Sequence, residues 1–293
     1  MIAVTGATGA LGRRVVDRLA EREDVRLRLV VRDATRAPRV PGAEVVAAPG
    51  GYADGAGLSA ALAGADTVYL VSAGEAEDRL QQHRTAVRAV AEAGVQRVVY
   101  TSFVGAGRPD PTFTLVRDHT ATEEAVRATG LRHTFLRHCM YADFVPFFAT
   151  LEDGQAVIAA PAGDGRVAFV SRDDLADVGA AALLDDSPAL DGAALEVTGP
   201  EALTLDDAAA VLAEVTGRPA LYRRQTVEEA WATRRPSGHP DWEVEGWVSS
   251  YRAIAAGELA RVTDVVPTLT GHAARTVTEH LRAHPEDWAH LRG

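Results

Sequence analysis

Lysine is absent from the sequence, and all 30 of its basic residues are arginine. Cysteine occurs once, as Cys139, which excludes an internal disulfide; its surroundings, LRHCMYADF, favour a packing thiol over a nucleophile. The formal net charge is −11 and no concentrated basic face occurs, which excludes a nucleic-acid partner. Any mechanism that needs a lysine ammonium group is excluded as well.

Long apolar runs are also missing, since none approaches the ~20 residues that a membrane-spanning helix needs. The first strand-like run begins at residue 2, which leaves no room for a signal peptide. We therefore expect a cytoplasmic protein without a membrane partner. With 293 residues, 47% of them hydrophobic, the chain can bury one extended core or a large domain with a smaller one.

Glycines at three-residue intervals stand in the stretch TGATGALG, residues 5–12. The run before them is typical of a short buried strand, and the pattern after them is typical of an amphipathic helix. Glycine lets the backbone approach a ligand closely, while free amides and the helix dipole attract phosphate. A second strand-like run at 25–31 completes the context of a dinucleotide fingerprint. We therefore predict nucleotide binding here, with a tight turn alone as the alternative.

The segments that follow alternate between strand-like and helix-like patterns, which predicts an α/β fold with a parallel, doubly wound sheet. We expect strands at 25–31, 66–72, 96–102 and 132–137, and helices near 55–63, 76–93 and 115–129. Such sheets bind ligands at the carboxyl ends of their strands. That edge is expected to hold Arg32, residues 72–74, residues 101–104 and residues 137–141.

Past residue 140 the alternation loosens, which predicts a second domain. Residues 164–184 are expected to form a strand and a helix capped by Ser171, and residues 203–217 a helix with Thr204 as its cap and Gly217 as its stop. We expect a nucleotide-binding domain at 1–140, with 164–200 returning to its sheet. A smaller substrate-binding domain is expected at 141–163 and 201–293.

Five stretches carry a family likeness: AVTGATGALG near the start, LVVRD at the second strand, VVYTSF, RDHTATEEAVRATGLRHTFLRHCMYADF and GDGRVAFVSRDDLADVGAAAL. Together they resemble the NmrA-like branch of the short-chain dehydrogenase/reductase superfamily, especially type 2 quinone oxidoreductases and triphenylmethane reductase. The resemblance covers essentially the whole chain and implies a Rossmann domain, a smaller substrate domain and a nicotinamide cofactor. Two departures stand out. Gly51 replaces a common acidic residue, and His138 replaces a common asparagine beside the expected nicotinamide pocket.

The residues after the second strand bear on the choice of dinucleotide. An acid there binds the ribose 2′-hydroxyl of NAD, whereas arginine accommodates the 2′-phosphate of NADP. Arg32, Arg36 and Arg13 favour NADP(H), whereas Asp33 favours NAD. Alternatively, these arginines are only solvated surface charges. The predicted cofactor-binding residues are Gly6, Thr8, Gly9, Ala10, Leu11, Gly12, Arg13, Arg32, Arg36, Ser72, Ala73 and Thr101.

The resemblance also raises a question about catalysis, because most of the superfamily reduces carbonyls with a tyrosine activated by a lysine. By the resemblance, His119 lies nearest to the place of the missing tyrosine–lysine pair, and Glu123 follows four residues later on the same helical face. His119 is then either a catalytic acid held by this carboxylate or one partner of an ordinary surface pair. Ser102, His138 and Tyr141 are the other catalytic candidates, because each follows or ends a strand.

Aromatic residues supply the predicted substrate contacts, which are Phe103, Tyr141, Trp242, Trp247 and Tyr251. The last three alternatively pack in a core, as aromatic residues at helical spacing often do. His280 and His284 stand four residues apart, a spacing that can hold a metal, but no third ligand is evident. We therefore predict no metal.

Two classes of function remain open. The first is an NADPH-dependent oxidoreductase that transfers hydride to a quinone or a similar electron-poor small molecule. The second is a redox sensor of NmrA type, which binds the cofactor and a protein partner without turnover. A carbonyl reductase and an isomerase are further alternatives. The aromatic carboxyl-terminal segment favours the reductase, and a homodimer is compatible with it.

Overall fold

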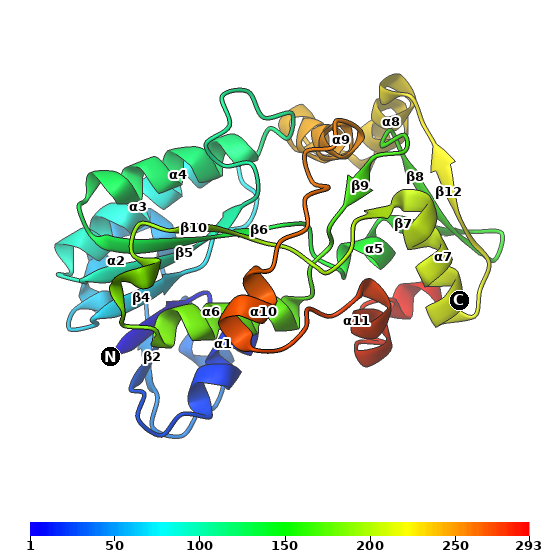
Figure 1. Ribbon diagram of the computed structural model, residues 1–293. Helices are drawn as coiled ribbons and strands as arrows, with labels where there is room; N and C mark the ends of the chain where they lie inside the picture. Colours follow the sequence, from blue (N-terminus) through cyan, green and yellow to red (C-terminus); the bar gives the residue numbers. More distant parts are fainter. Residues whose placement is uncertain (293) are drawn as a thin grey trace. The chain divides into compact units, whose positions relative to one another are not determined.

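The computed structural model describes residues 1–292 and divides into two compact units (Figure 1). The first unit comprises residues 1–106, 118–137 and 175–196, and the second comprises residues 107–117, 138–174 and 197–293. Across the described residues, no helix combines the length and the apolar character needed to cross a membrane.

A seven-stranded sheet forms the centre of the first unit, in the order β10-β6-β5-β4-β1-β2-β3. Its strands are β1 (Ile2–Thr5), β2 (Leu27–Val31), β3 (Glu44–Ala47), β4 (Thr67–Leu70), β5 (Arg97–Phe103), β6 (Arg132–His138) and β10 (Ala194–Val197). The pairs from β3 through β2, β1 and β4 to β5 are parallel. At the other edge, the amide of Gly192 donates to the His133 carbonyl, that of Phe135 to Ala193 and that of Cys139 to Val197. The partner residues advance in the same direction along both segments, as in a parallel pair of strands.

Helices cover both faces of this sheet (Figure 1). One face packs against α2 (Gly55–Leu62), α3 (Arg79–Glu92) and α4 (Val116–Ala128), whose apolar side chains join one core cluster with Val68, Val98 and Phe135. The other face meets α1 (Ala10–Ala20) and α6 (Arg172–Leu184), where Gly179 leaves room for Tyr69 and Val15. The predicted α/β class with a doubly wound parallel sheet is confirmed.

The second unit holds a smaller sheet in the order β12-β8-β7, made by β7 (Ala149–Glu152), β8 (Gln155–Ala160) and β12 (Ala220–Arg224). β8 runs parallel to β12 and antiparallel to β7, and α7 (Leu205–Thr216) packs on this sheet. A two-stranded antiparallel pair joins β9 (Arg166–Val167) to β11 (Leu203–Thr204). The remaining helices are α5 (Phe144–Phe147), α8 (Val227–Arg234), α9 (Asp241–Ala255), α10 (Val265–Thr270) and α11 (Val277–Ala283).

The local capping predictions hold in the second unit. Thr204 caps α7 in a reciprocal capping box with Asp207, and Gly217 ends that helix with a left-handed φ of 67°. The amide of Asp173 donates to Ser171 Oγ at the start of α6 across 3.1 Å. Neither β3 nor the small three-stranded sheet was expected from the sequence.

Candidate active site

The glycine turn between β1 and α1 has the geometry that its sequence predicts. Gly6 has a φ of 64°, a conformation that favours glycine, and a Cβ there would come within 3.1 Å of Val71. Gly12 packs α1 against the turn so closely that a Cβ would collide with the Gly6 carbonyl oxygen. Gly9 differs, because a Cβ there meets only that same oxygen, at 3.3 Å. Gly6 and Gly12 therefore serve the turn itself, while Gly9 keeps the space above it open.

A cavity of about 490 Å³ lies at this turn, within the first unit. Within the described chain, no side chain caps α1 at Gly9, and no acidic residue stands in its first turn. The amides at that helix end can therefore bind an anion. The cavity is lined by Thr5, Gly6, Thr8, Gly9, Val30, Val31, Arg32, Ala48, Gly51, Tyr52, Leu58, Val71, Ser72, Ala73, Gly74, Glu75, Ala76 and Gln82.

Half of the predicted cofactor-binding residues line this cavity, and half do not. Gly6, Thr8, Gly9, Arg32, Ser72 and Ala73 belong to its wall. Leu11 and Gly12 are buried outside the lining, and Thr101 is buried behind it, where it accepts a hydrogen bond from the amide of Ser72. Ala10, Arg13 and Arg36 are exposed and lie outside the lining. The apolar part of the wall, which was not expected from the sequence, consists of Val30, Ala48, Tyr52 and Leu58.

Arg32 is the arginine that the structure places at the cavity, directly after β2. No hydrogen bond or ion pair engages its guanidinium among the residues that the structure describes. Its stem passes Gly51, where a Cβ would lie 3.3 Å from Arg32 Cδ. Asp33, the argument for NAD, instead accepts hydrogen bonds from the amide and hydroxyl of Thr35 at 2.9 and 2.7 Å. Arg32 is therefore available to an anionic ligand, whereas Asp33 is engaged within its own turn.

Three buried side chains hold the loop after β4 in place, and two of them, Arg79 and His83, were not singled out from the sequence. Thr101 Oγ1 accepts from the Ser72 amide at 2.7 Å, and His83 Nε2 accepts from the Ala73 amide at 2.9 Å. Arg79 donates to the Ala73 carbonyl at 3.1 Å and to Ser72 Oγ at 2.7 Å. Arg79 and His83 stand four residues apart on α3, so a shared helical face was the available signal. We call Thr101, Arg79 and His83 the loop clamp.

His83 is an uncharged member of this clamp. Burial, together with the adjacent Arg79 cation, lowers its pKa to about 3. Its Nδ1 lies 2.9 Å from Thr122 Oγ1, whose hydroxyl donates onward to the Asp118 carbonyl at 2.6 Å. His83 therefore donates from Nδ1 and accepts at Nε2.

His119 lies in the same network, through its contact with Arg79. Arg79 Nη2 lies 3.0 Å from His119 Nε2, and since arginine only donates, this nitrogen must accept. The Nδ1–H of His119 then donates to the Tyr100 hydroxyl, 3.0 Å away. Burial raises the pKa of Tyr100 to about 12, which keeps that hydroxyl protonated. Arg79 and Tyr100 thus engage both ring nitrogens of His119. The predicted pair of His119 with Glu123 stays a prediction.

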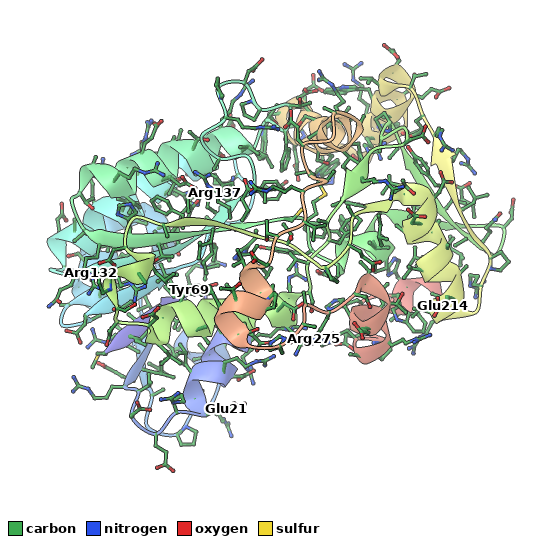
Figure 2. The ribbon with its side chains drawn as sticks, in the orientation of Figure 1. Glu21, Tyr69, Arg132, Arg137, Glu214 and Arg275 are labelled. Atoms are coloured by element: carbon green, nitrogen blue, oxygen red, sulfur yellow. The ribbon has the colours of Figure 1, made fainter. Side chains whose placement is uncertain are left out.

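Glu123 is bound by side chains of β5, β6 and its own helix α4. Arg137, labelled in Figure 2, donates to both of its carboxylate oxygens at 2.8 and 2.7 Å. Arg127 donates at 3.0 Å and the Ser102 hydroxyl at 2.7 Å. The buried Ser102 thus gives its proton to Glu123, which removes it as a donor to a substrate. Phe103, the next residue of β5, lies beside the His119 ring at a centroid distance of 6.0 Å.

His138 and Tyr141 belong to the second unit and lie next to each other. His138 Nδ1 is 3.4 Å from the Tyr141 hydroxyl, and Arg172 covers the Tyr141 ring at 4.6 Å while forming an ion pair with Asp143. Burial lowers the pKa of His138 to about 3, so its ring is neutral at pH 7. Its Nε2 is buried and has no hydrogen-bond partner within residues 1–292. His138 is therefore not an imidazolium donor at neutral pH.

The aromatic residues of α9 pack within the second unit. Tyr251 is buried, with Phe148 at 5.2 Å and the Arg234 guanidinium over its ring at 5.1 Å. Trp247 packs on a small apolar cluster between α8 and α9, and Trp242 is half-buried on the same helix. These contacts favour packing for Tyr251 and Trp247. Cys139 is buried as predicted, with its sulfur 3.7 Å from the Leu259 carbonyl.

Comparison with known proteins agrees with this geometry. A model of the NmrA-like family matches residues 1–237. The chain is 36% identical to (4-alkanoyl-5-oxo-2,5-dihydrofuran-3-yl)methyl phosphate reductase of Streptomyces griseus, over 99% of each chain. It is 30% identical to quinone oxidoreductase 2 of Escherichia coli, over 96% of this chain and 97% of that protein.

Solved structures give the same picture. A structure of an NADPH-dependent quinone oxidoreductase from Escherichia coli, complexed with NADPH, matches with a TM-score of 0.86 at 30% identity, covering 98% of this chain and 100% of that one. The triphenylmethane reductase of Citrobacter sp., complexed with NADP(H), matches with a TM-score of 0.83 at 29% identity, covering 97% and 100%. The chain belongs to the NmrA-like family.

Proposed function

We propose that this protein is an NADPH-dependent oxidoreductase that transfers hydride to a quinone or a comparably electron-poor small molecule. The observation that carries the cofactor assignment is the cavity at the glycine turn, which Arg32 lines. Within residues 1–292, no hydrogen bond or ion pair engages the Arg32 guanidinium. Gly9 and the α1 amides bind the pyrophosphate, Arg32 binds the ribose 2′-phosphate, and the apolar wall accommodates the adenine. When bound, the cofactor supplies the hydride.

The acceptor class follows from the proton donors that the chain lacks. It has no lysine to activate a tyrosine. The ring protons and lone pairs of His119 are engaged by Arg79 and Tyr100, and Ser102 donates to Glu123. Hydride transfer to a simple ketone needs a positioned acid, typically worth 10² to 10⁴ in rate. A quinone spreads the developing charge over its ring, so water can complete the protonation. Tyr141 stays a candidate donor.

The activities for which the relatives are named support this acceptor class. They include a quinone oxidoreductase, an NAD(P)H azoreductase and a reductase of a 5-oxo-2,5-dihydrofuran that carries a 4-alkanoyl group. The ring double bond in that last compound is conjugated with two carbonyls, so it too is electron-poor. The negative transcriptional regulator NmrA shares the fold at 18% identity, which bears on the fold alone.

The test is steady-state oxidation of NADPH with a panel of acceptors: a benzoquinone, an azo dye, a conjugated lactone and a simple ketone. We expect multiple turnovers with at least one of the first three. Tight NADPH binding without turnover on any acceptor would identify a cofactor-binding regulator instead. Light scattering of the same sample tests the homodimer, which stays a prediction.

A further inference from the structure

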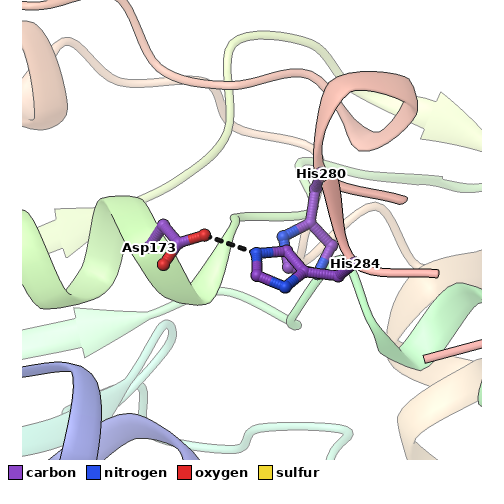
Figure 3. A group of neighbouring side chains, drawn as sticks. All are labelled: Asp173, His280 and His284. Atoms are coloured by element: carbon purple, nitrogen blue, oxygen red, sulfur yellow. Dashed lines mark hydrogen bonds and ion pairs between the residues drawn. The ribbon is translucent and has the colours of Figure 1, made fainter. Parts of the chain in front are cut away.

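We propose a divalent transition-metal site, of the kind that Zn²⁺ occupies, at Asp173, His280 and His284 in the second unit (Figure 3). One ligand atom from each of these side chains lies within 4.8 Å of the other two. Two imidazoles and a carboxylate form a three-ligand set that Zn²⁺ accepts, with water as the fourth ligand. The sequence prediction of no metal rested on a missing third ligand, and Asp173 fills that place.

The backbone brings the ligands together from two helices. His280 lies in α11 and His284 directly follows that helix, so the two rings lie side by side with centroids 4.7 Å apart. Asp173 stands in the first turn of α6, 111 residues from His284 in sequence, and its Oδ2 lies 2.6 Å from His284 Nε2. Figure 3 shows this carboxylate directed at the histidine pair.

One nitrogen of each ring faces the first turn of α6. For His284 it is Nε2, through its contact with Asp173. For His280 it is Nδ1, which lies 3.0 Å from Ser171 Oγ. That hydroxyl also accepts from the Asp173 amide at 3.1 Å, which places it within the same turn. His284 Nε2 is therefore directed at the Asp173 carboxylate, and His280 Nδ1 at Ser171, two residues before Asp173.

The other nitrogen of each ring faces a carboxylate. His280 Nε2 lies 3.1 Å from Asp287 Oδ2, and His284 Nδ1 lies 3.0 Å from Glu286 Oε1. Metal-binding histidines usually donate their second N–H to a carboxylate, which orients the ring and makes the ligand more basic. Both rings thus have an orienting carboxylate on the side away from Asp173. Two histidines that were only surface residues of a helix would not need an orienting carboxylate on each ring.

The metal would join α6 to the carboxyl-terminal helix α11, which are distant in the sequence. None of its ligands belongs to the residues that we propose to bind the cofactor or to act in hydride transfer. The site is therefore independent of the proposed oxidoreductase function, and its test does not use activity. Because a metal that binds the folded chain stabilises it, the melting temperature should rise as Zn²⁺ is added.

Calorimetric titration of the full-length, untagged chain with Zn²⁺, after treatment with a chelator, tests the site. We expect one saturable equivalent in the wild type. Asp173→Asn and His284→Ala remove a ligand and should weaken binding by about 100-fold or more, while Asp287→Asn, which leaves all three ligands in place, should weaken it by about 10- to 100-fold. The matched control is His239→Ala, which removes an exposed histidine that pairs with Glu243 at 3.0 Å, and it should bind as the wild type does.

Two results would overturn the site: no saturable Zn²⁺ binding by the wild type, or equal binding by the wild type and both ligand variants. Circular dichroism of the metal-free variants checks that they fold. If His284→Ala does not fold, Asp173→Asn and Asp287→Asn still decide the question. Co²⁺ provides a second readout, because its visible absorption in a four-coordinate site should appear in the wild type and be lost in Asp173→Asn.

Discussion

Arg79 donates from Nη2 to His119 Nε2 across 3.0 Å, and this contact joins the histidine to the wall of the nucleotide cavity. The same guanidinium donates to Ser72 and Ala73, which line that cavity. One buried cation therefore fixes both the loop and the tautomer of the histidine. His119 is held in a form that has no spare proton to give.

Replacing Arg79 with methionine tests this role. The change leaves Ser72 Oγ, the Ala73 carbonyl and His119 Nε2 without their donor. Each buried group left unsatisfied should lower the free energy of unfolding by about 1–3 kcal/mol. We expect the KM for NADPH to rise about 10-fold with a smaller change in kcat. Steady-state kinetics measure both. Arg88→Met, at an exposed arginine of the same helix, is the control, and equal KM values in the two variants would contradict the clamp.

Replacing Arg32 with alanine tests the cofactor preference. A charge-assisted contact to the 2′-phosphate is worth a few kcal/mol at most, so NADPH binding should weaken on the order of 10- to 100-fold while NADH binding changes little. Fluorescence titration with each nucleotide gives the comparison. Arg39→Ala removes the same charge from an exposed position nearby and should affect neither nucleotide. Equal losses for both nucleotides in Arg32→Ala would argue against the assignment.

The glycine turn allows a matched pair of variants. Gly9→Val should abolish nucleotide binding and leave the protein folded, because its side chain enters the cavity and meets few protein atoms. Gly12→Ala should instead lower the melting temperature, because its Cβ collides with the Gly6 carbonyl oxygen. Thermal unfolding and nucleotide titration separate the two effects. A folded Gly9→Val protein with wild-type affinity would mean that Gly9 serves only the turn.

Stability should fall as the pH is lowered from about 6.5 toward 3. Burial lowers the pKa of His83 and of His138 to about 3, below the 6.5 of an unfolded chain. Between these values the unfolded state binds more protons, so the free energy of unfolding rises with pH, by up to about 1.4 kcal/mol per pH unit for each histidine. His138→Asn should flatten this dependence, whereas His239→Asn, at an exposed site, should not. Urea unfolding at several pH values measures the slope, and identical slopes in wild type and His138→Asn would refute the explanation.

The parts of the site that depend on local chemistry could be predicted from the sequence. A glycine turn, a following amphipathic helix and an arginine directly after β2 are features of neighbouring residues. The contact between Arg79 and His119 could not be predicted, because it joins α3 and α4 across 40 residues and depends on how those helices pack. Asp173 and His284, 111 residues apart, escaped prediction for the same reason.

The partners of Glu123 show the limit of helical spacing as a guide to contacts. Four-residue spacing allows His119 and Glu123 to share a face, but it does not decide which partner each takes. Arg137, from the end of β6, offers both carboxylate oxygens a parallel pair of charge-assisted bonds, which are stronger than one bond to an imidazole. The strand β3 was missed because its short stretch, EVVA, is mostly exposed and lacks a buried pattern.

The most direct test of the proposed reaction is kcat/KM with NADPH for a quinone and for a simple ketone, measured under one set of conditions in the wild type and in His119→Ala. The account predicts efficient quinone reduction, little or no ketone reduction, and only a modest loss in the variant, because His119 orders the loop through Arg79 and donates no proton to the acceptor. Efficient ketone reduction by the wild type that collapses about a thousandfold in His119→Ala would contradict it, since a loss of that size is what a positioned acid contributes.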